Sequence, residues 1–342
     1  MQGGRVPPLI FCGECMDYPQ DASVGLVDGK FIDENEATAQ VGSLIPSTWA
    51  NALTDEVLAV QSDAGLEADE SNHAQLLAAI KLIVARMGQA SYSSPVGTAR
   101  NARMSVTAAA KTASFTADEI ILSAALGGQT YRLAAFNKTV DLTVVGVGGM
   151  DVGAAPASGF VAVYAIYNPT TGASALIAMN ATAAKAPEVY GGGYMPAGYV
   201  ASALVSVWPT NASSQFVAGY QEDRHFRYMT QVSVLTTATN SANTALSIAG
   251  AVPKNAKSIY GNAGFYGTAS AVGAAMQIQV YPFSGASWNS VAYYVAQSAT
   301  LFQISGTFWD LALPTSQTMY YTTTSSNVSS ITFSITIYSY RF

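Results

Sequence analysis

Hydrophobic side chains in residues 42–84 recur every three or four positions, which is the spacing of one face of an α-helix. Pro46 and Ser47 suit the start of a first helix, and Asn72 is a suitable N-cap for a second. The first apolar stripe comprises Trp49, Leu53, Val57, Val60 and Ala64, and the second comprises Leu76, Leu77, Ile80, Ile83, Val84 and Met87. We therefore expect a short α-helical hairpin over residues 41–90.

Two short amphipathic helices cannot bury both apolar stripes against each other alone, so this hairpin needs further cover. One interpretation is a small helical core inside a single globular domain. The other, which we favour, is an adaptor that packs against copies of itself or against a docking partner. The attachment residues would be Trp49, Leu53, Val57, Leu76, Leu77 and Ile80.

Residues 91–114 are small and polar and are typical of a linker, and after them the hydrophobic period changes to two. Residues 159–180 are predicted to form a β-hairpin around a turn at 168–172, and residues 200–220 a second hairpin. A dense cluster of charged side chains at 221–228 marks the predicted end of this middle domain.

The region from residue 229 to residue 342 is almost free of charge and alternates cleanly between apolar and polar positions. Ile335 and Ile337, for example, are predicted to point one way, with Thr336 and Tyr338 on the opposite face. Short strands, frequent turns and the lack of a helical pattern predict an antiparallel β-sandwich or jelly roll. The fold class expected for the whole chain is therefore mainly β with a short N-terminal helical hairpin.

Composition limits the possible functions of the 342-residue chain. Charged residues make up 11% of it, well below the roughly 25% of an ordinary soluble protein, so burial of surface between subunits is expected. The formal net charge of −6 argues against nucleic acid as a partner. No apolar run is long enough for a membrane span, and the first residues lack the long apolar core of a signal peptide, so we expect synthesis in the cytoplasm.

Cys12 and Cys15 form a C-x-x-C pair, which can bind a metal or exchange disulfides. A zinc site needs four ligands, and the two histidines, His73 and His225, are far away in the sequence. Thiolates from several subunits could still gather on a shared axis. Reduced cysteines or a local disulfide are the favoured alternatives, and we predict no metal site and no cofactor.

Several sequence blocks resemble the tail-fibre proteins of tailed bacteriophages. Those near the N-terminus are FIDENEA (31–37), GSLIPSTWANALTDEV (42–57), DAGL (63–66) and NHAQLLAAI (72–80). Those in the middle are ADEI (117–120), GGQTYRL (127–133), AIYNPTTG (165–172), PEVYGGG (187–193) and MPAGY (195–199). The resemblance covers roughly residues 30–225 and does not extend to the remaining C-terminal residues.

The resemblance implies an elongated homotrimer in the virion tail, made in the cytoplasm of a bacterial host. It would join other tail or baseplate proteins through its N-terminal region and bind a glycan, a pilus or an outer-membrane protein of the host through its C-terminal domain. The expected parts are a tail-attachment segment (1–40), the helical adaptor (41–90), a linker (91–114), a middle β domain (115–228) and a C-terminal receptor-binding β-sandwich (229–342).

Aromatic side chains crowd the C-terminal domain, and tyrosine and tryptophan can stack on sugars or grip a protein surface. Most of them would fill the core of a sandwich, and Tyr320 and Tyr321 cannot both face inward on one strand. The candidate receptor-binding residues are Trp288, Tyr293, Tyr294, Trp309, Tyr320 and Tyr321.

An enzymatic function has little support in the sequence. A glycosidase needs a pair of carboxylates, and the C-terminal domain offers one acid, Asp310. A serine triad needs a histidine, and His225 stands outside any nucleophile-elbow pattern. We therefore predict a structural binding protein without catalytic residues. The alternatives are a polysaccharide depolymerase on the same scaffold and an internal tail component without host contact.

Overall fold

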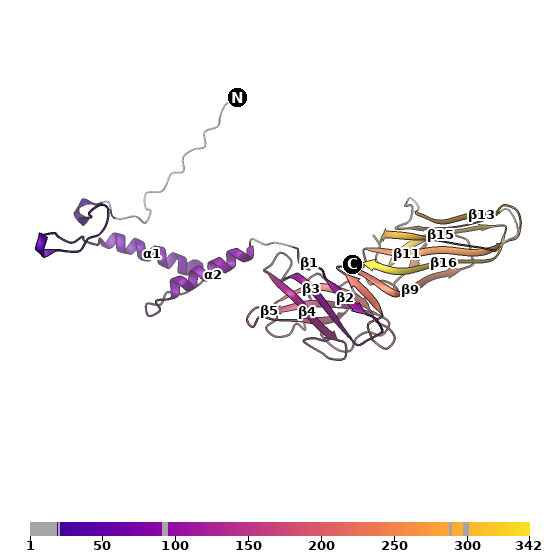
Figure 1. Cartoon of the computed structure of the whole chain (residues 1–342), viewed down its shortest axis with the longest axis horizontal. Helices are drawn as coiled ribbons and strands as arrows, with labels where there is room; N and C mark the ends of the chain where they lie inside the picture. The colour runs from indigo at the N-terminus through magenta and orange to yellow at the C-terminus, as the bar shows by residue number, and fades with distance from the viewer. Residues whose placement is uncertain (1–18, 20, 91–94, 287–288, 297–300) are drawn as a thin grey trace, which may run out of the picture. The chain divides into compact units, whose positions relative to one another are not determined.

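The computed structural model describes residues 19, 21–90, 95–286, 289–296 and 301–342. The chain divides into two compact units, residues 1–91 and residues 92–342 (Figure 1). The first unit contains the helices and the second contains the strands. The fold is therefore mainly β with an N-terminal helical pair, as the hydrophobic periods predict.

The first unit consists of two short 3₁₀ helices, η1 (Ala22–Val24) and η2 (Glu36–Thr38), followed by α1 (Ser47–Asp63) and α2 (Gln75–Ala90). These two α-helices confirm the predicted helical segments. The side chain of Asn72 accepts a hydrogen bond from the backbone N–H of Ala74 at 3.1 Å, which stabilises the turn that enters α2.

Helices α1 and α2 contact each other. Ala79 of α2 and Gln61 of α1 are buried, and Phe31 covers Trp49 with a ring-centroid distance of 5.3 Å. The half-buried members of the predicted stripes are Trp49, Val57, Val60, Ala64 and Ile83. The large side chains left exposed on the two helices are Leu53, Leu58, Leu76, Leu77, Ile80, Leu82 and Val84. The side chain of Met87 lies outside the described part of the chain.

The second unit contains two antiparallel sheets. In the larger sheet the strand order is β14-β11-β16-β9-β8-β2-β3-β7-β5-β6, and both β1 and β4 pair with β3. These strands are β1 (Ala99–Arg100), β2 (Arg103–Val106), β3 (Thr112–Ser123), β4 (Thr130–Asp141), β5 (Phe160–Asn168), β6 (Ala173–Asn180), β7 (Ala201–Pro209), β8 (Gly219–Glu222), β9 (His225–Thr237), β11 (Ser258–Ala269), β14 (Leu301–Ala312) and β16 (Val328–Arg341).

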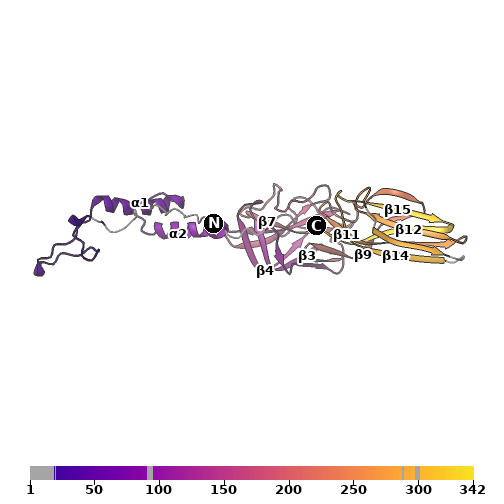
Figure 2. The same cartoon turned by 90° about the horizontal axis from the view of Figure 1, so that it is seen from above.

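The smaller sheet has the order β10-β15-β12-β13. Its strands are β10 (Ser241–Ser247), β12 (Ala274–Tyr281), β13 (Asn289–Ala296) and β15 (Thr318–Ser326). It lies against β11, β14 and β16 of the larger sheet, and Figure 2 shows β12 and β15 beside β11 and β14 in a second view. Met276 and Met319 of the smaller sheet and Phe333 of the larger one belong to the same hydrophobic core.

Three expectations about the second unit are corrected by the structure. The predicted linker (91–114) in fact includes strands β1 and β2 and the start of β3. The sequence pattern did not indicate these strands, because the alternation of exposed Arg103 and buried Met104 is short and lies in a tract of small residues. The predicted hairpin over residues 200–220 forms only at its turn, where Thr210 and Phe216 make an antiparallel bridge, and the two strands that flank it do not pair with each other. Strand β7 is buried along its whole length and pairs with β5, whereas β8 pairs with β2 and β9.

The third correction concerns the predicted boundary at residue 228, which falls inside β9. An aromatic cluster crosses this point: Trp208 and Phe226 have ring centroids 4.6 Å apart, and Phe226 and Tyr340 have centroids 4.9 Å apart. The buried hydroxyl of Tyr340 donates a hydrogen bond to the carbonyl oxygen of Val207 at 2.6 Å. The predicted middle and C-terminal domains therefore share one sheet and one core.

The predicted alternation along the last strand is confirmed. Phe333, Ile335 and Ile337 of β16 are fully buried, whereas Thr336 and Tyr338 are partly exposed. Within the described ranges, neither helix is both long and apolar enough to cross a membrane.

Candidate functional site

Three β-bulges lie side by side on one face of the larger sheet. Strand β11 pairs with β14 at Gly261–Phe308 and again at Ile259–Leu311, so Tyr260 faces two residues, Trp309 and Asp310. Asp310 has a φ of 50°, in the left-handed region, as the extra residue of some bulges does. The bulge brings two consecutive side chains to the same exposed face of the sheet.

The neighbouring strands are irregular at the same level. On β16, Ser339 pairs with Tyr260 and Ile337 pairs with Gly261, so Tyr338 is an extra residue. The pairing of β16 with β9 is irregular at Tyr338 as well, since Ser339 pairs with Arg227 whereas Ile337 pairs with Val232. Bulges bend a strand and redirect its side chains, and here they open a hollow between β9 and β14.

This hollow, which we call the aromatic groove, has a volume of about 590 Å³. Trp309 forms one side of it and is 68% exposed. The Thr307 hydroxyl donates a hydrogen bond to the side-chain oxygen of the half-buried Asn262 at 2.9 Å. The groove is lined by Arg227, Tyr228, Met229, Thr230, Gln231, Asn262, Thr307, Trp309 and Tyr338.

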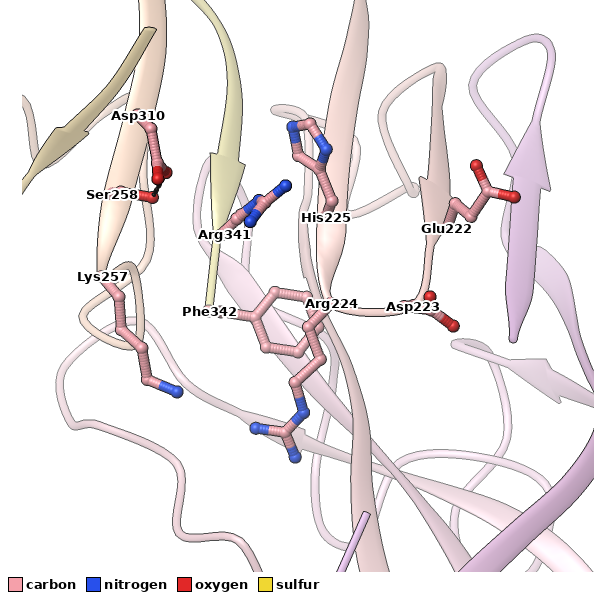
Figure 3. Close-up of a pocket in the computed structure, with 9 residues that line it drawn as sticks. All are labelled: Glu222, Asp223, Arg224, His225, Lys257, Ser258, Asp310, Arg341 and Phe342. Carbon is pink, nitrogen blue, oxygen red and sulfur yellow. Dashed lines mark hydrogen bonds between the residues drawn. The ribbon is translucent and has the colours of Figure 1, made fainter. Parts of the chain in front are cut away.

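A second hollow of about 620 Å³, the charged hollow, adjoins the ends of the same strands (Figure 3). Figure 3 shows Arg341 between Asp310 on one side and His225 on the other. Asp310 accepts a hydrogen bond from the Ser258 hydroxyl, and Arg224 forms a bidentate ion pair with Glu188. The lining residues are Glu222, Asp223, Arg224, His225, Lys257, Ser258, Asp310, Arg341 and Phe342.

The charged groups of this hollow shift one another's protonation equilibria. The hydrogen bond from Ser258 lowers the pKa of Asp310, and Arg341 acts in the same direction, so Asp310 stays ionised. Burial lowers the pKa of His225, and the positive charges of Arg341 and Arg227 lower it further. His225 is therefore held in its neutral form at neutral pH.

Tyr260 joins the two hollows. Its hydroxyl donates a hydrogen bond to Asp310 at 3.0 Å, and its ring meets the Trp309 ring edge-on at a centroid distance of 6.2 Å. The ring centroid of His225 lies 4.8 Å from that of Tyr260, and the guanidinium carbon of Arg341 lies 5.8 Å from the Tyr260 centroid. One buried tyrosine thus fixes the positions of Trp309, Asp310 and Arg341.

The candidate residues named from the sequence do not form one site. Trp309 lies in the aromatic groove, and Trp288 lies outside the described residues. Tyr293 is exposed on β13 of the smaller sheet, while Tyr294 packs on Phe302 at 4.8 Å. On β15, Tyr321 is buried and Tyr320 is half-buried, as expected for neighbours on one strand.

Sequence reasoning missed the polar partners of Trp309, which are Arg227, Gln231, Asn262 and Tyr338. One signal was available on β16, where the two buried side chains Ile337 and Tyr340 are three positions apart instead of two. That spacing indicates a bulge. The residues that the bulge faces come from distant parts of the chain, and no sequence pattern near them indicates that they meet.

The described residues contain no group of three or more His, Cys, Asp or Glu side chains placed to hold a metal ion. Cys12 and Cys15 lie outside the described ranges. No protein-family model matches the sequence, and no curated protein is similar to it. The site must therefore be interpreted from its own chemistry.

Proposed function

We propose that this chain is a tail-fibre protein of a tailed bacteriophage and that it binds the host-cell surface through the aromatic groove. The observation that carries the proposal is the exposed Trp309, held in place by Tyr260 and bordered by amide and hydroxyl side chains. The resemblance of the sequence blocks to those of tail-fibre proteins supports the same role. As such a protein, the chain would be made in the host cytoplasm and would reside in the virion tail.

The groove suits a saccharide better than a protein receptor. The flat face of an exposed tryptophan can stack on the apolar face of a sugar ring, and the side chains of Asn262, Gln231 and Thr307 can exchange hydrogen bonds with sugar hydroxyls. We therefore propose a host surface glycan as the receptor. A pilus or an outer-membrane protein is the alternative that the experiment below separates.

We further propose that the protein is an elongated homotrimer in which the two antiparallel sheets form a β-sandwich. The apolar residues that α1 and α2 leave exposed would be covered by two further copies or by a tail or baseplate protein. Three grooves on one particle would bind a repetitive surface with much higher avidity than one groove.

The alternative of a depolymerase finds little support in the charged hollow. His225 forms a hydrogen bond with the Ser339 hydroxyl, the pair of groups that activates a serine nucleophile. Ser339 is fully buried, however, so a substrate carbon cannot reach its oxygen. The lowered pKa of Asp310 also makes it a poor proton donor at neutral pH. We therefore propose binding without catalysis.

The function is tested with the purified full-length protein, fluorescently labelled and counted by flow cytometry on a panel of bacterial strains. Trp309→Ala is expected to reduce binding at least about tenfold, since loss of a central aromatic contact costs roughly 2 kcal/mol or more. Tyr293→Ala, an equally exposed aromatic on the other sheet, is the control and should bind as the wild type does.

Pretreatment of the cells identifies the receptor class. Mild periodate oxidation of surface sugars should abolish binding, whereas protease treatment should leave it unchanged. The opposite pattern would indicate a pilus or an outer-membrane protein. Equal binding by wild type and Trp309→Ala on every strain would contradict a role for the groove in adsorption.

A further inference from the structure

Arg227 has a fixed position at the edge of the aromatic groove. It lies on β9 between Phe226 and Tyr228, whose side chains are both buried in the core. Its guanidinium carbon lies 5.1 Å from the ring centroid of Tyr338, a cation–π contact that orients the planar donor group. The charge is therefore held in place before any ligand arrives.

No carboxylate among the described residues forms an ion pair with this guanidinium. Among the described residues that line the groove, Arg227 is the one charged side chain. Within the described part of the chain its guanidinium has no ion pair or hydrogen bond, and Tyr338 is its neighbour. The nearby acids are engaged elsewhere, since Glu222 pairs with Arg103 at 3.4 Å and Asp310 accepts hydrogen bonds from Ser258 and Tyr260.

The charged hollow differs in this respect. It contains charges of both signs: the cations Arg224, Arg341 and Lys257 and the acids Asp310, Glu222 and Asp223. An anionic ligand entering that hollow would meet like charges. The aromatic groove offers a cation without an acid, in the same groove as an exposed tryptophan.

We propose that the aromatic groove binds an anionic saccharide, in which Arg227 pairs with a carboxylate or phosphate group while Trp309 stacks on a sugar ring. This inference rests on the proposed function and adds the chemical class of the glycan. The guanidinium presents a rigid set of N–H donors that matches both anions bidentately. A neutral sugar of the same shape would leave that donor set unpaired.

The experiment uses the full-length protein on an array of purified bacterial surface polysaccharides. Each polysaccharide is immobilised in three forms: as isolated, after chemical reduction of its carboxylates to alcohols, and after removal of its phosphates with hydrofluoric acid. We expect binding to fall at least about tenfold in one treated form, since charge-assisted hydrogen bonds are lost. The treatment that removes binding identifies carboxylate or phosphate as the anion.

Variants assign the effect to Arg227. Arg227→Gln should bind the isolated and the treated forms equally weakly, and Arg227→Lys should recover part of the difference, because it keeps the charge and loses the planar donors. Arg100→Gln, which removes an exposed cation from β1, is the control and should behave as the wild type does. Binding of the wild type should weaken with added salt more than that of Arg227→Gln.

The outcomes separate the two proposals. Trp309-dependent binding that survives both chemical treatments, or that is unchanged in Arg227→Gln, overturns the anionic class and leaves glycan binding intact. If no polysaccharide in any form is bound, glycan binding itself is overturned together with the inference. Thermal melting of each variant checks that Arg227→Gln is folded, which we expect because the Arg227 side chain is exposed.

Discussion

Gly261 shows how single residues shape the exposed face of the larger sheet. A Cβ atom at this position would lie 2.3 Å from the carbonyl oxygen of Thr336 and 2.2 Å from the ring of Phe308. Only glycine therefore lets β11 approach both neighbours where the bulges begin. The close approach places Tyr260, the preceding residue, between Trp309 and the charged hollow.

His225 should make the stability of the second unit depend on pH. It faces Arg341 on β16, Arg227 on its own strand, Asp310 on β14 and Glu222 on β8. Because its native pKa is below the ordinary value of 6.5, the unfolded chain binds a proton more readily than the native one. Stability contributed by neutral His225 is present above pH 6.5 and is lost as pH falls below that value through the native pKa.

We expect the urea midpoint of the wild type to fall between pH 7.5 and pH 5, and His225→Gln to reduce this dependence. Urea unfolding followed by tryptophan fluorescence measures both. The control is His73→Gln, which alters the exposed histidine of the first unit. Identical pH profiles for the wild type and His225→Gln would show that this imidazole does not titrate differently on folding.

At the level of elements, α1 and α2 are each well formed but together leave much apolar surface uncovered. Their interface buries Ala79 and the polar Gln61, whose side-chain oxygen has no hydrogen-bond partner among the described residues. Leu77 is 58% exposed and Ile80 is 45% exposed on α2. A helical pair of this kind gains little stability from its own contacts, so a partner surface is expected to complete it.

The double variant Leu77→Gln/Ile80→Gln tests whether these side chains hold the assembly together. Because both are exposed within one chain, the helices should persist, as measured by circular dichroism. The mass measured by light scattering should fall from about three times the 35.6 kDa of one chain toward a single chain. Lys81→Gln on the same helix is the control. A wild type that is already monomeric would contradict the homotrimer.

The elements that could be predicted from sequence are those set by neighbouring residues. The turn between β5 and β6 is an example: the Asn168 side chain accepts hydrogen bonds from the backbone of Thr170 and Thr171, and Gly172 has a φ of 72°. The helices also follow from local spacing. Strand β8, by contrast, pairs with β2 and β9 rather than with the preceding strand, and no local pattern marks that choice.

The candidate site was predictable only to the extent of Trp309, an aromatic residue in a region rich in them. Its partners Arg227, Asn262 and Tyr338 come from three other strands and meet because the bulges align. Alignment of that kind depends on pairing between distant segments. A single sequence gives no indication of which segments pair.

At the scale of the whole second unit, the shared core predicts that its two halves fold together. Tyr340 bonds to Val207, and Phe226 packs on Trp208, so a cut at residue 228 divides one cluster. We expect residues 95–342 to unfold in a single calorimetric transition and residues 229–342 alone to remain unfolded. Two separate transitions, or a stable 229–342 fragment, would restore the independent C-terminal domain that the sequence predicts.

The position of β16 has a consequence for biosynthesis. It fills the space between β9 and β11, and its residue Ile335 pairs with Leu235, 100 positions earlier. While the ribosome is still making the intervening segment, β9 and β11 each present a bare edge that can recruit a strand from a neighbouring nascent chain. Frameshifts or premature stops upstream of β16 should therefore yield insoluble product rather than a shortened soluble protein, and a chaperone that shields strand edges would raise the yield of the intact protein.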